Sequence, residues 1–472
     1  MDFTILAVEI LIALLGLAVL VLGLALPGKA QKYVNGVALS GLGLILLYLI
    51  LSYSKGASLF NGVYQIDLYG NYFKILFLSA GILVMLMAGI YIKRFEEKSS
   101  EFYGLMILAT LGMMLMVSAG EFITLYVGLE LMTISFYILT AYLKSDKLSG
   151  EAGLKYLILG AVSSAILLFG ISLVYASLGT TNFIAIGASF TSSSAVIAGV
   201  VMIIAGFAFK VSVVPFHMWT PDIYQGAPIP VTTYLSVGSK AAGFAALVRV
   251  FMIAVDVSDP VFNWSLLLAV LAAMTIIIGN LIALSQRDIK RLLAYSSIAQ
   301  AGYILVGVTA ANSYGLKGVL FYALIYVFAN VGAFAVATAV EVDTGRTDIE
   351  AFAGLSKRSP LLAAIMTICM LSLAGIPPMA GFAGKFYLFA GAIQSGYLWL
   401  ALIGLIMSMV SVYYYLGVSK AMYIGENSSG SPVAIGTGST VALWVCVLAT
   451  ILLGVYPGPL SELAGAAIQI FL

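Results

Sequence analysis

The chain has 472 residues, of which 62% are hydrophobic and only 9% charged, and its mean hydropathy is +1.10. Soluble domains carry about 25% charged residues, so this composition excludes an ordinary soluble protein and predicts an all-α polytopic membrane protein. The formal net charge of +2 favours neither nucleic acid nor an acidic substrate as a partner.

Fourteen apolar segments are candidates for membrane-spanning helices, each of which needs about 20 mostly apolar residues. The first is long enough to be a retained span and not a cleaved signal peptide. Proline or glycine interrupts the seventh, the eighth and the twelfth. The fourteen run approximately over 3–26, 34–54, 72–92, 103–119, 121–143, 153–178, 195–214, 229–254, 264–285, 292–311, 317–341, 360–395, 397–423 and 438–458.

The basic residues predict an orientation, because Lys and Arg are enriched in cytoplasmic loops. Of the 22 Lys and Arg, fourteen lie in or beside alternate loops of one side: Lys29, Lys32, Lys93, Arg94, Lys98, Lys144, Lys147, Arg287, Lys290, Arg291, Arg346, Lys357, Arg358 and Lys420. Only Lys55, Lys74 and Lys317 lie in or beside loops of the other side. This bias predicts an even number of helices, both termini outside, and the loops near residues 94, 146, 288 and 350 in the cytoplasm.

Four ionisable residues lie inside long apolar runs: Glu130, Lys210, Lys240 and Lys385. A charged side chain at the centre of a bilayer costs roughly 3 kcal/mol on insertion scales. Such residues normally face the interior of a helix bundle or a water-filled cavity, and they mark ion or proton routes. One Glu and three Lys on four segments therefore predict a proton path.

Glu130 lies nine residues after Glu121, which begins its segment, so it is expected about 13 Å inside the membrane. Lys210 is its expected partner, and a Glu–Lys pair would titrate as a unit. Separation of the two groups could then switch their affinity for a proton. The alternatives are an ion pair that only locks two helices and a lysine that reaches for the membrane surface.

Lys240 is surrounded by glycine and alanine, which leave room for water, and a central lysine suits the storage of a proton. Lys385 has a similar setting in the twelfth segment. Lys155 begins the sixth segment and is either interfacial or part of the path. His217, the single histidine, suits proton transfer near neutral pH, although a structural histidine fits equally well. Arg249 cannot release its proton, so it is interpreted as a fixed or structural charge.

An internal repeat is expected because two segments combine a lysine with a helix-breaking stretch. Lys210 is followed by Pro215, and Pro377-Pro378 precede Lys385, five segments further on. Transporters often contain two inverted repeats, each with one broken helix that lines the ion site. The predicted parts are N-terminal helices 1–102, a first repeat 103–254, an inverted second repeat 255–424 and a C-terminal helix 425–472. The alternative is that Pro and Gly are simply common in membrane helices.

Several motifs of energy-converting proteins are missing from the sequence. Gly384-Lys385 is followed by Phe386 and not by Ser or Thr, so no phosphate-binding loop supports a nucleotide-driven pump. The two cysteines, Cys369 and Cys446, form no C-x-x-C pair, which argues against iron–sulfur or zinc ligation. A single histidine excludes a haem held by two histidines of this chain, and no dinucleotide-binding fingerprint occurs. The sequence thus predicts proton movement without electron carriers, driven by an ion gradient or a partner protein.

At these residues the sequence resembles the antiporter-like membrane subunits of respiratory complex I, and most of all subunit N of the NADH:quinone oxidoreductase type. The resemblance covers approximately residues 120–390. Its most specific run is PFHMWTPDIYQGAPIPV, and GLKYLILG and YSSIAQAGY point to subunit N. Further runs that support it are GLELMTISFYIL and LAGIPPMAGFAGKFYLF.

The resemblance implies a role for each matching position. Glu130 corresponds to the glutamate of the fifth helix and Lys210 to its paired lysine. Lys240 corresponds to the central lysine of the eighth helix, Lys385 to the terminal lysine of the twelfth, and Lys155 to a lysine of the sixth. The family also has the two inverted repeats of five helices.

The resemblance also implies a function. The chain would be a proton-translocating subunit without redox groups in a complex I-type enzyme of a prokaryotic cell membrane, where quinone, iron–sulfur clusters and flavin belong to partner subunits. The electron donor stays open between NADH, reduced ferredoxin and a reduced deazaflavin. The alternatives are a subunit of a multisubunit sodium/proton antiporter and a scaffold whose buried charges only lock helices. Gln300 departs from the family pattern, because relatives often carry a titrating histidine there.

Overall fold

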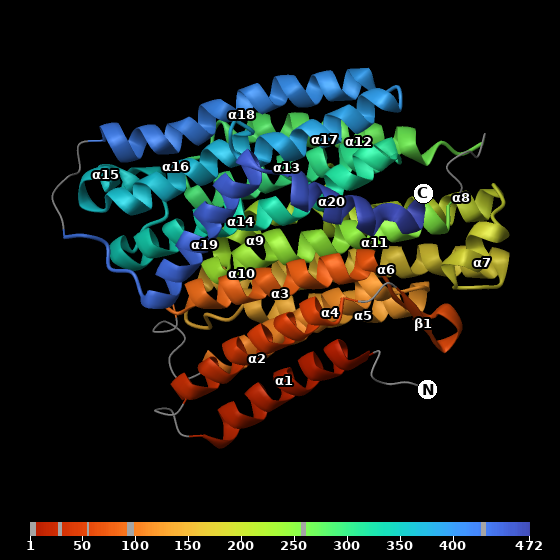
Figure 1. The fold of residues 1–472 in the computed structure, drawn as a ribbon, viewed down its shortest axis with the longest axis horizontal. Helices are drawn as coiled ribbons and strands as arrows, with labels where there is room; N and C mark the ends of the chain where they lie inside the picture. Colours follow the sequence, from red (N-terminus) through yellow and green to blue (C-terminus); the bar gives the residue numbers. More distant parts are fainter. Residues whose placement is uncertain (1–5, 27–30, 54–55, 92–98, 256–260, 426–430) are drawn as a thin grey trace.

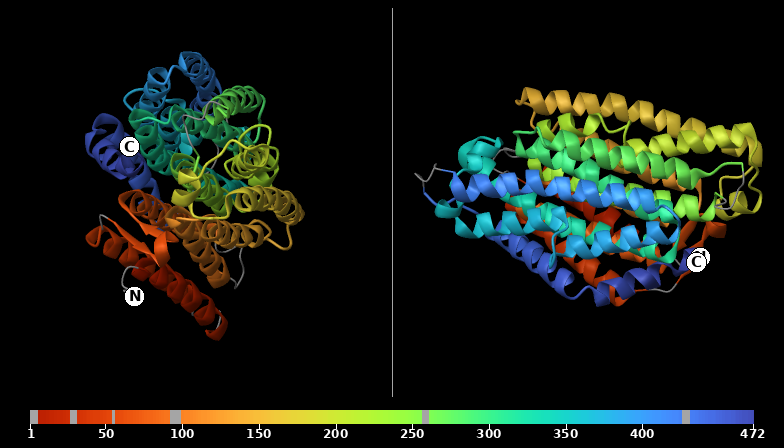
Figure 2. Two further views of the ribbon diagram at one scale, coloured as in Figure 1. Left: turned by 90° about the vertical axis from the view of Figure 1, so that its right-hand side faces the viewer. Right: turned by 90° about the horizontal axis from the view of Figure 1, so that it is seen from above.

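The protein is a bundle of nearly parallel helices in a computed structural model that describes residues 6–26, 31–53, 56–91, 99–255, 261–425 and 431–472. Seen from the end, the helices of the two halves lie side by side, and the first two helices form one edge of the molecule (Figure 2). Helix α18 lies at the opposite edge from α1 and α2 (Figure 1).

The elements before the middle of the chain are α1 (Ala7–Ala25), α2 (Gln31–Leu51), β1 (Ala57–Leu59), η3 (Phe60–Gly62), β2 (Tyr64–Ile66), α3 (Leu68–Ala88), α4 (Ser99–Ser118), α5 (Phe122–Thr140), α6 (Lys147–Leu178), α7 (Phe183–Ala188), α8 (Ser194–Lys210), α9 (Trp219–Gly226), α10 (Ile229–Tyr234), the π-helical turn η5 (Leu235–Ser239) and α11 (Lys240–Ile253). The later elements are α12 (Trp264–Ala283), α13 (Ile289–Ala310), α14 (Ser313–Thr344), η6 (Ile349–Phe352), α15 (Leu355–Arg358), α16 (Pro360–Ala374), α17 (Ala380–Gln394), α18 (Leu398–Ile424), α19 (Thr437–Val455), α20 (Gly458–Ala467) and η7 (Ile468–Phe471).

The all-helical membrane class predicted from composition is confirmed. Each of the fourteen predicted segments coincides with a helix or with a pair of helices. Among the described residues, twelve spans are long and apolar enough to cross a membrane, and the apolar helices α8 and α16 are shorter. The number of crossings stays a prediction, as do the two inverted repeats and the domain boundaries.

Two helices are broken where the sequence predicts it. The first of the two broken helices stops at Lys210, the last residue of α8, and continues after eight residues as α9. The second ends at Ala374, the last residue of α16, and continues as α17 from Ala380. Gly375 closes α16 with φ +84°, a left-handed conformation that glycine adopts without strain.

The last membrane helix is also interrupted, which the sequence analysis did not predict. Helix α19 ends at Val455 and α20 follows from Gly458, so that the two cross the bundle together (Figure 1). A Cβ on Gly454 would lie 2.1 Å from the carbonyl oxygen of Pro378 and 2.5 Å from the nitrogen of Ala380. The interruption therefore packs closely on the break between α16 and α17.

Helix α1 begins and η7 ends at the same end of the bundle, at the right in Figure 1. Helix α15, which carries Lys357 and Arg358, lies at the opposite end. This arrangement fits an even number of crossings, and the assignment of one end to the cytoplasm stays a prediction. Five of the basic residues used for it lie outside the described residues, namely Lys29, Lys55, Lys93, Arg94 and Lys98, and the side chain of Lys32 is not described either.

The position of Lys74, expected in or beside a loop of the other side, needs a correction. Lys74 lies within α3 with 2% of its surface exposed, and its ammonium group is 2.6 Å from a carboxylate oxygen of Glu9 on α1. The sequence also did not predict the short hairpin of β1 and β2 that precedes α3. Arg249 has the structural role expected of it, because it is buried and pairs with Asp67 at 2.8 Å.

Candidate functional site

Lys210 lies at the first helix break, where the end of α8 meets α5, α6 and α11. Its amino group donates to the hydroxyl of Thr133 at 2.7 Å and to the hydroxyl of Tyr156 at 3.3 Å. Its stem packs on Gly243 of α11, where a Cβ would lie 3.5 Å from Lys210 Cγ and 2.7 Å from Val211 Cγ1. The close approach of α8 and α11 therefore requires glycine at position 243.

Glu130 lies one turn before Thr133 on α5, and its carboxylate accepts a hydrogen bond from Ser164 of α6. Although both residues are described, no ion pair within 4.0 Å joins Glu130 to Lys210. The two groups are connected through one turn of α5 and not by direct contact. Their action as a switchable pair stays a prediction.

Lys240 follows the π-helical turn η5, a local widening of the helix that is frequent at functional sites. It is buried, and its amino group donates to the hydroxyl of Ser297 at 2.5 Å and to the carbonyl oxygen of the same residue at 3.1 Å. Lys240 and Gln300 line one cavity of about 10 Å³, roughly the space of a single water molecule.

Gln300 lies one turn after Ser297 on α13 and connects the site of Lys240 to the second helix break. Its amide nitrogen donates to the carbonyl oxygen of Leu373 at 2.9 Å and to the hydroxyl of Tyr415 at 3.1 Å. Its amide oxygen accepts from the hydroxyl of Tyr322 at 2.5 Å. Gln300 is therefore fully engaged as a hydrogen-bonding group, although it cannot titrate.

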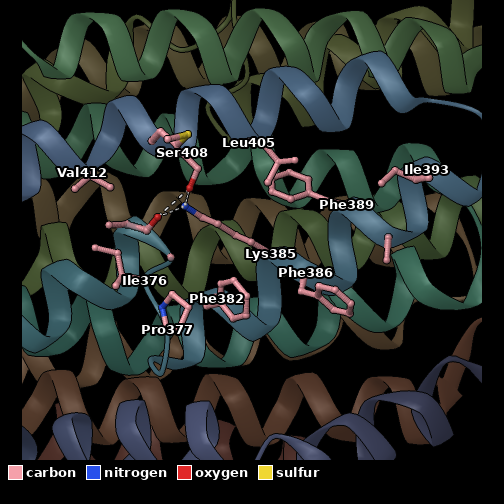
Figure 3. A pocket seen from close by; sticks show the side chains of 14 residues that line it. Ile376, Pro377, Phe382, Lys385, Phe386, Phe389, Ile393, Leu405, Ser408 and Val412 are labelled. Atoms are coloured by element: carbon pink, nitrogen blue, oxygen red, sulfur yellow. Dashed lines mark hydrogen bonds between the residues drawn. The ribbon is translucent and has the colours of Figure 1, made fainter.

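Lys385 lies on α17 and reaches back across the second break (Figure 3). Its amino group donates to the carbonyl oxygens of Leu373 and Ala374 at 3.1 and 3.0 Å and to the hydroxyl of Ser408 at 2.9 Å. The ring centre of Tyr303 lies 4.4 Å from the same nitrogen, within the range of a cation–π interaction. Polar groups thus follow one another from Lys240 through Ser297 and Gln300 to Lys385, and the step from Ser297 to Gln300 is one turn of α13 beside the small cavity that both line.

An apolar cavity of about 450 Å³ adjoins Lys385, between α17 and α18 (Figure 3). Phe386 and Met409 line it with 59% and 76% of their surfaces exposed, so it opens toward the side of the bundle. The lysine amine is thereby the polar end of an otherwise apolar recess.

Neither Lys155 nor His217 has a hydrogen bond to Lys240, Ser297, Gln300 or Lys385 in the described part of the chain. Lys155 is 42% exposed on α6, and its amino group contacts Glu151 at 2.7 Å and Asp222 at 2.9 Å. His217 lies in the break between α8 and α9, where its Nδ1 is buried without a hydrogen-bond partner among the described residues. Of the six candidate residues, Lys240 and Lys385 approach the same turn of α13: Lys240 bonds to Ser297, and Lys385 shares the carbonyl oxygen of Leu373 with Gln300.

The hydrogen-bond partners of the lysines were not predicted from the sequence. They are mostly Ser, Thr and Tyr hydroxyls on neighbouring helices, namely Thr133, Tyr156, Ser297 and Ser408. The described residues contain no cluster of His, Cys, Asp and Glu that could hold a metal ion.

A comparison with known protein families matches residues 119–411 to the family described as NADH:quinone oxidoreductase/Mrp antiporter, TM. The chain is 50% identical to NADH-quinone oxidoreductase subunit N of Desulforamulus reducens, over 100% of this chain and 99% of the relative. It is 51% identical to the subunit N of Moorella thermoacetica, over 99% and 98% of the two chains.

Solved structures show the same fold. A chain of respiratory complex I from Thermus thermophilus superimposes with a TM-score of 0.84 at 33% identity, covering 97% of this chain and 99% of that one. A chain of the Mrp complex from Dietzia superimposes with a TM-score of 0.89 at 22% identity, covering 100% and 98%, and this likeness concerns the fold alone. The chain therefore belongs to the NADH:quinone oxidoreductase/Mrp antiporter family, within which its relatives are subunits N of NADH-quinone oxidoreductase.

Proposed function

We propose that this chain is a proton-translocating membrane-arm subunit of a complex I-type oxidoreductase. The observation that carries the proposal is the buried polar route that links Lys240 to Lys385 through Ser297 and Gln300. A lysine buried in an apolar bundle is costly, and such residues usually serve ion or proton movement. The subunit N relatives support the assignment to an enzyme that transfers electrons to a quinone.

In this proposal the chain carries protons but no electrons. Flavin, iron–sulfur clusters and quinone belong to partner subunits, and the energy of quinone reduction reaches this chain through the assembly. Both termini lie outside the cell, and residues 103–254 and 255–424 act as inverted repeats. Support for this orientation comes from the basic residues of alternate loops in the sequence, among them Lys357 and Arg358 of α15.

Each titrating residue has a part in the proposed route. Glu130 and Lys210 change their mutual influence when the partner subunits change state. Lys240 stores a proton at the centre, and Lys385 passes it on at the second break. Lys155 and His217 make no hydrogen bond to this route in the described part of the chain, and their part in proton transfer stays a prediction.

The test uses the whole enzyme in sealed vesicles, where electron transfer and proton movement are measured together. Lys240→Met and Lys210→Met keep the length of the side chain and remove the group that carries the proton. We expect fewer protons per electron pair, with electron transfer and assembly preserved. Lys144→Met, at an exposed loop position, is the control. An unchanged proton yield in both buried variants would refute the proposal.

A subunit of a multisubunit sodium/proton antiporter is the second candidate, because the fold is shared with the Mrp complex. The two functions predict different partners. Purification of the native assembly would yield iron–sulfur subunits in the first case and only small hydrophobic antiporter subunits in the second. Sodium transport without a redox reaction would favour the second function.

A further inference from the structure

The short helix α9 completes the first broken span, and charged residues of two other helices bind to Asp222 near its middle. One oxygen of Asp222 accepts from Lys155 of α6 at 2.9 Å, and the other accepts from Arg291 of α13 at 3.0 Å. Arg291 also donates to the amide oxygen of Gln225 at 3.0 Å. A single carboxylate on α9 thus joins the helices α6 and α13.

The C-terminal end of α9 is fixed by the same turn of α13. Lys290, the neighbour of Arg291, is buried and donates to the carbonyl oxygen of Ala227 at 2.8 Å, directly after the last residue of α9. The first turn of α13 therefore binds α9 at two points. Arg291 bonds to the side chain of Asp222, and Lys290 bonds to the backbone of Ala227.

The opposite end of α9 contacts the surroundings of Lys210. Trp219, one turn before Asp222, donates from its indole nitrogen to the carbonyl oxygen of Phe209 at 2.9 Å. Its ring stacks on Tyr156 with ring centres 5.0 Å apart and an interplanar angle of 12°. Phe209 precedes Lys210 in the chain, and the hydroxyl of Tyr156 accepts a hydrogen bond from Lys210.

We propose that Asp222 is a positioning residue, which sets the place of α9 and, through Trp219, the hydrogen bonds of Lys210. This inference rests on the proposed function of Lys210 in proton transfer. Helix α13 also carries Ser297, the partner of Lys240. The Asp222–Arg291 pair thus links the first break to the helix that holds the central lysine.

Asp222 positions the site more than it stabilises the fold. Asp222 and Lys155 are each 42% exposed, and ion pairs with this exposure contribute little to stability. Proton transfer, by contrast, depends steeply on geometry, since a displacement of about 1 Å can lower a rate roughly a hundredfold. Loss of the carboxylate charge should therefore impair proton transfer before it impairs assembly.

The experiment compares Asp222→Asn with Asp222→Glu in the whole enzyme reconstituted in vesicles. The asparagine keeps the shape and loses the charge, whereas the glutamate keeps the charge. We expect the asparagine variant to lower the protons moved per electron pair by about threefold or more, a modest part of the loss that misplacement can cause. The glutamate variant should recover most of the loss.

Two further variants make the test specific. Trp219→Phe removes the indole donor to Phe209 and should reproduce the loss seen with Asp222→Asn. The matched control is Asp343→Asn, because Asp343 pairs with Arg358 at 2.7 Å at the same end of the bundle without a hydrogen bond to α9. The control should leave the proton yield unchanged.

The outcomes separate the two proposals. A normal yield in Asp222→Asn, together with a reduced yield in Lys210→Met, would overturn the positioning role alone. A normal yield in both would overturn the proposed role of Lys210 in proton transfer as well, and a normal yield in Lys240→Met in addition would overturn the proposed function. Equal losses in Asp222→Asn and Asp343→Asn would mean that any lost ion pair at this end has the same effect, and that result also overturns the positioning role.

Discussion

The two broken helices place a lysine beside an interrupted backbone, yet they surround the two lysines with different chemistry. At the first break, Lys210 meets the side-chain hydroxyls of Thr133 and Tyr156. At the second, Lys385 meets the backbone carbonyl oxygens of Leu373 and Ala374 and one hydroxyl. The sequences around the two lysines look alike, but the groups that accept hydrogen bonds from the two amino groups differ.

The difference follows from which groups form hydrogen bonds with the backbone at each break. After α8, the nitrogens of Ser212 and Val213 donate back to the carbonyl oxygens of Phe209 and Ala208 at 3.0 and 2.7 Å. Lys210 is then free to bond to side chains. After α16, side chains donate to the free carbonyl oxygens. Lys385 and Gln300 donate to that of Leu373, and Lys385 and Ser408 donate to that of Ala374.

This contrast bears on which charge state each site accommodates. The hydroxyl of Tyr156 can accept from an ammonium group or donate to a neutral amine, whereas the hydroxyl of Thr133 already donates to the carbonyl oxygen of Leu129, so the site of Lys210 fits both forms through Tyr156. A carbonyl oxygen only accepts, and the three oxygens around Lys385 match the three donors of an ammonium group. Tyr303 adds a ring face to the same nitrogen. The first break is therefore suited to exchange a proton and the second to hold one.

The largest expected effect comes from reversing the charge at the second break. In Lys385→Glu a carboxylate would face two carbonyl oxygens, and a buried charge without a partner costs about 3–5 kcal/mol. We expect much less assembled enzyme than with Lys385→Met, measured by native gel electrophoresis and heat inactivation. At the first break, the difference between Lys210→Glu and Lys210→Met should be smaller, because the hydroxyl of Tyr156 can donate to a carboxylate. Equal assembly of the two Lys385 variants would contradict the comparison.

A smaller but still large effect is expected at Gly375, which closes α16. A Cβ there would lie 2.9 Å from Lys385 Cδ, and the left-handed backbone adds roughly 1–2 kcal/mol for any other residue. Gly375→Ala should lower heat stability and proton yield together. Gly345→Ala is the matched control, since Gly345 has φ +71° and open space around its Cβ position. Gly345→Ala should lower the heat stability through the left-handed backbone and leave the proton yield unchanged.

The sequence predicted the positions of the helices and the buried charges well, for a physical reason. A bilayer core requires long apolar segments, and a charge within them stands out against that background. Glu130, Lys240 and Lys385 were visible on this ground alone. The two broken helices were visible because proline and glycine interrupt apolar runs at Pro215 and Pro377.

The partners of the charges could not be predicted in the same way. Lipid and protein interior are both apolar, so the sequence of a membrane helix does not reveal which face packs inward. Thr133 and Ser297 are therefore indistinguishable in sequence from hydroxyls that face lipid. Lys74 was counted with the loop residues because it stood two residues inside a predicted span that began at residue 72, four residues after Leu68, and its partner Glu9 lies on a helix distant in sequence.

Removal of a single hydroxyl should affect proton yield differently at the two breaks. Thr133→Val takes away one of the two acceptors of Lys210, and hydrogen bonds to charged groups contribute about 1.5–3 kcal/mol. Ser408→Ala takes away one acceptor of Lys385, which retains two carbonyl oxygens. We expect the larger loss of proton yield in Thr133→Val, measured in vesicles at equal electron transfer. A larger loss in Ser408→Ala would reverse the proposed division between the breaks.

The smallest effect is expected at Gln300, where relatives often carry histidine. An imidazole can donate to the carbonyl oxygen of Leu373 and accept from Tyr322, so Gln300→His should keep the proton yield within about twofold, a free-energy change below roughly 0.5 kcal/mol. Gln300→Leu, similar in size but without donors or acceptors, should lose clearly more, because Tyr322 is then left without its partner. Since glutamine cannot titrate, full activity with leucine would mean that protons bypass this position, and the route from Lys240 to Lys385 would have to run elsewhere.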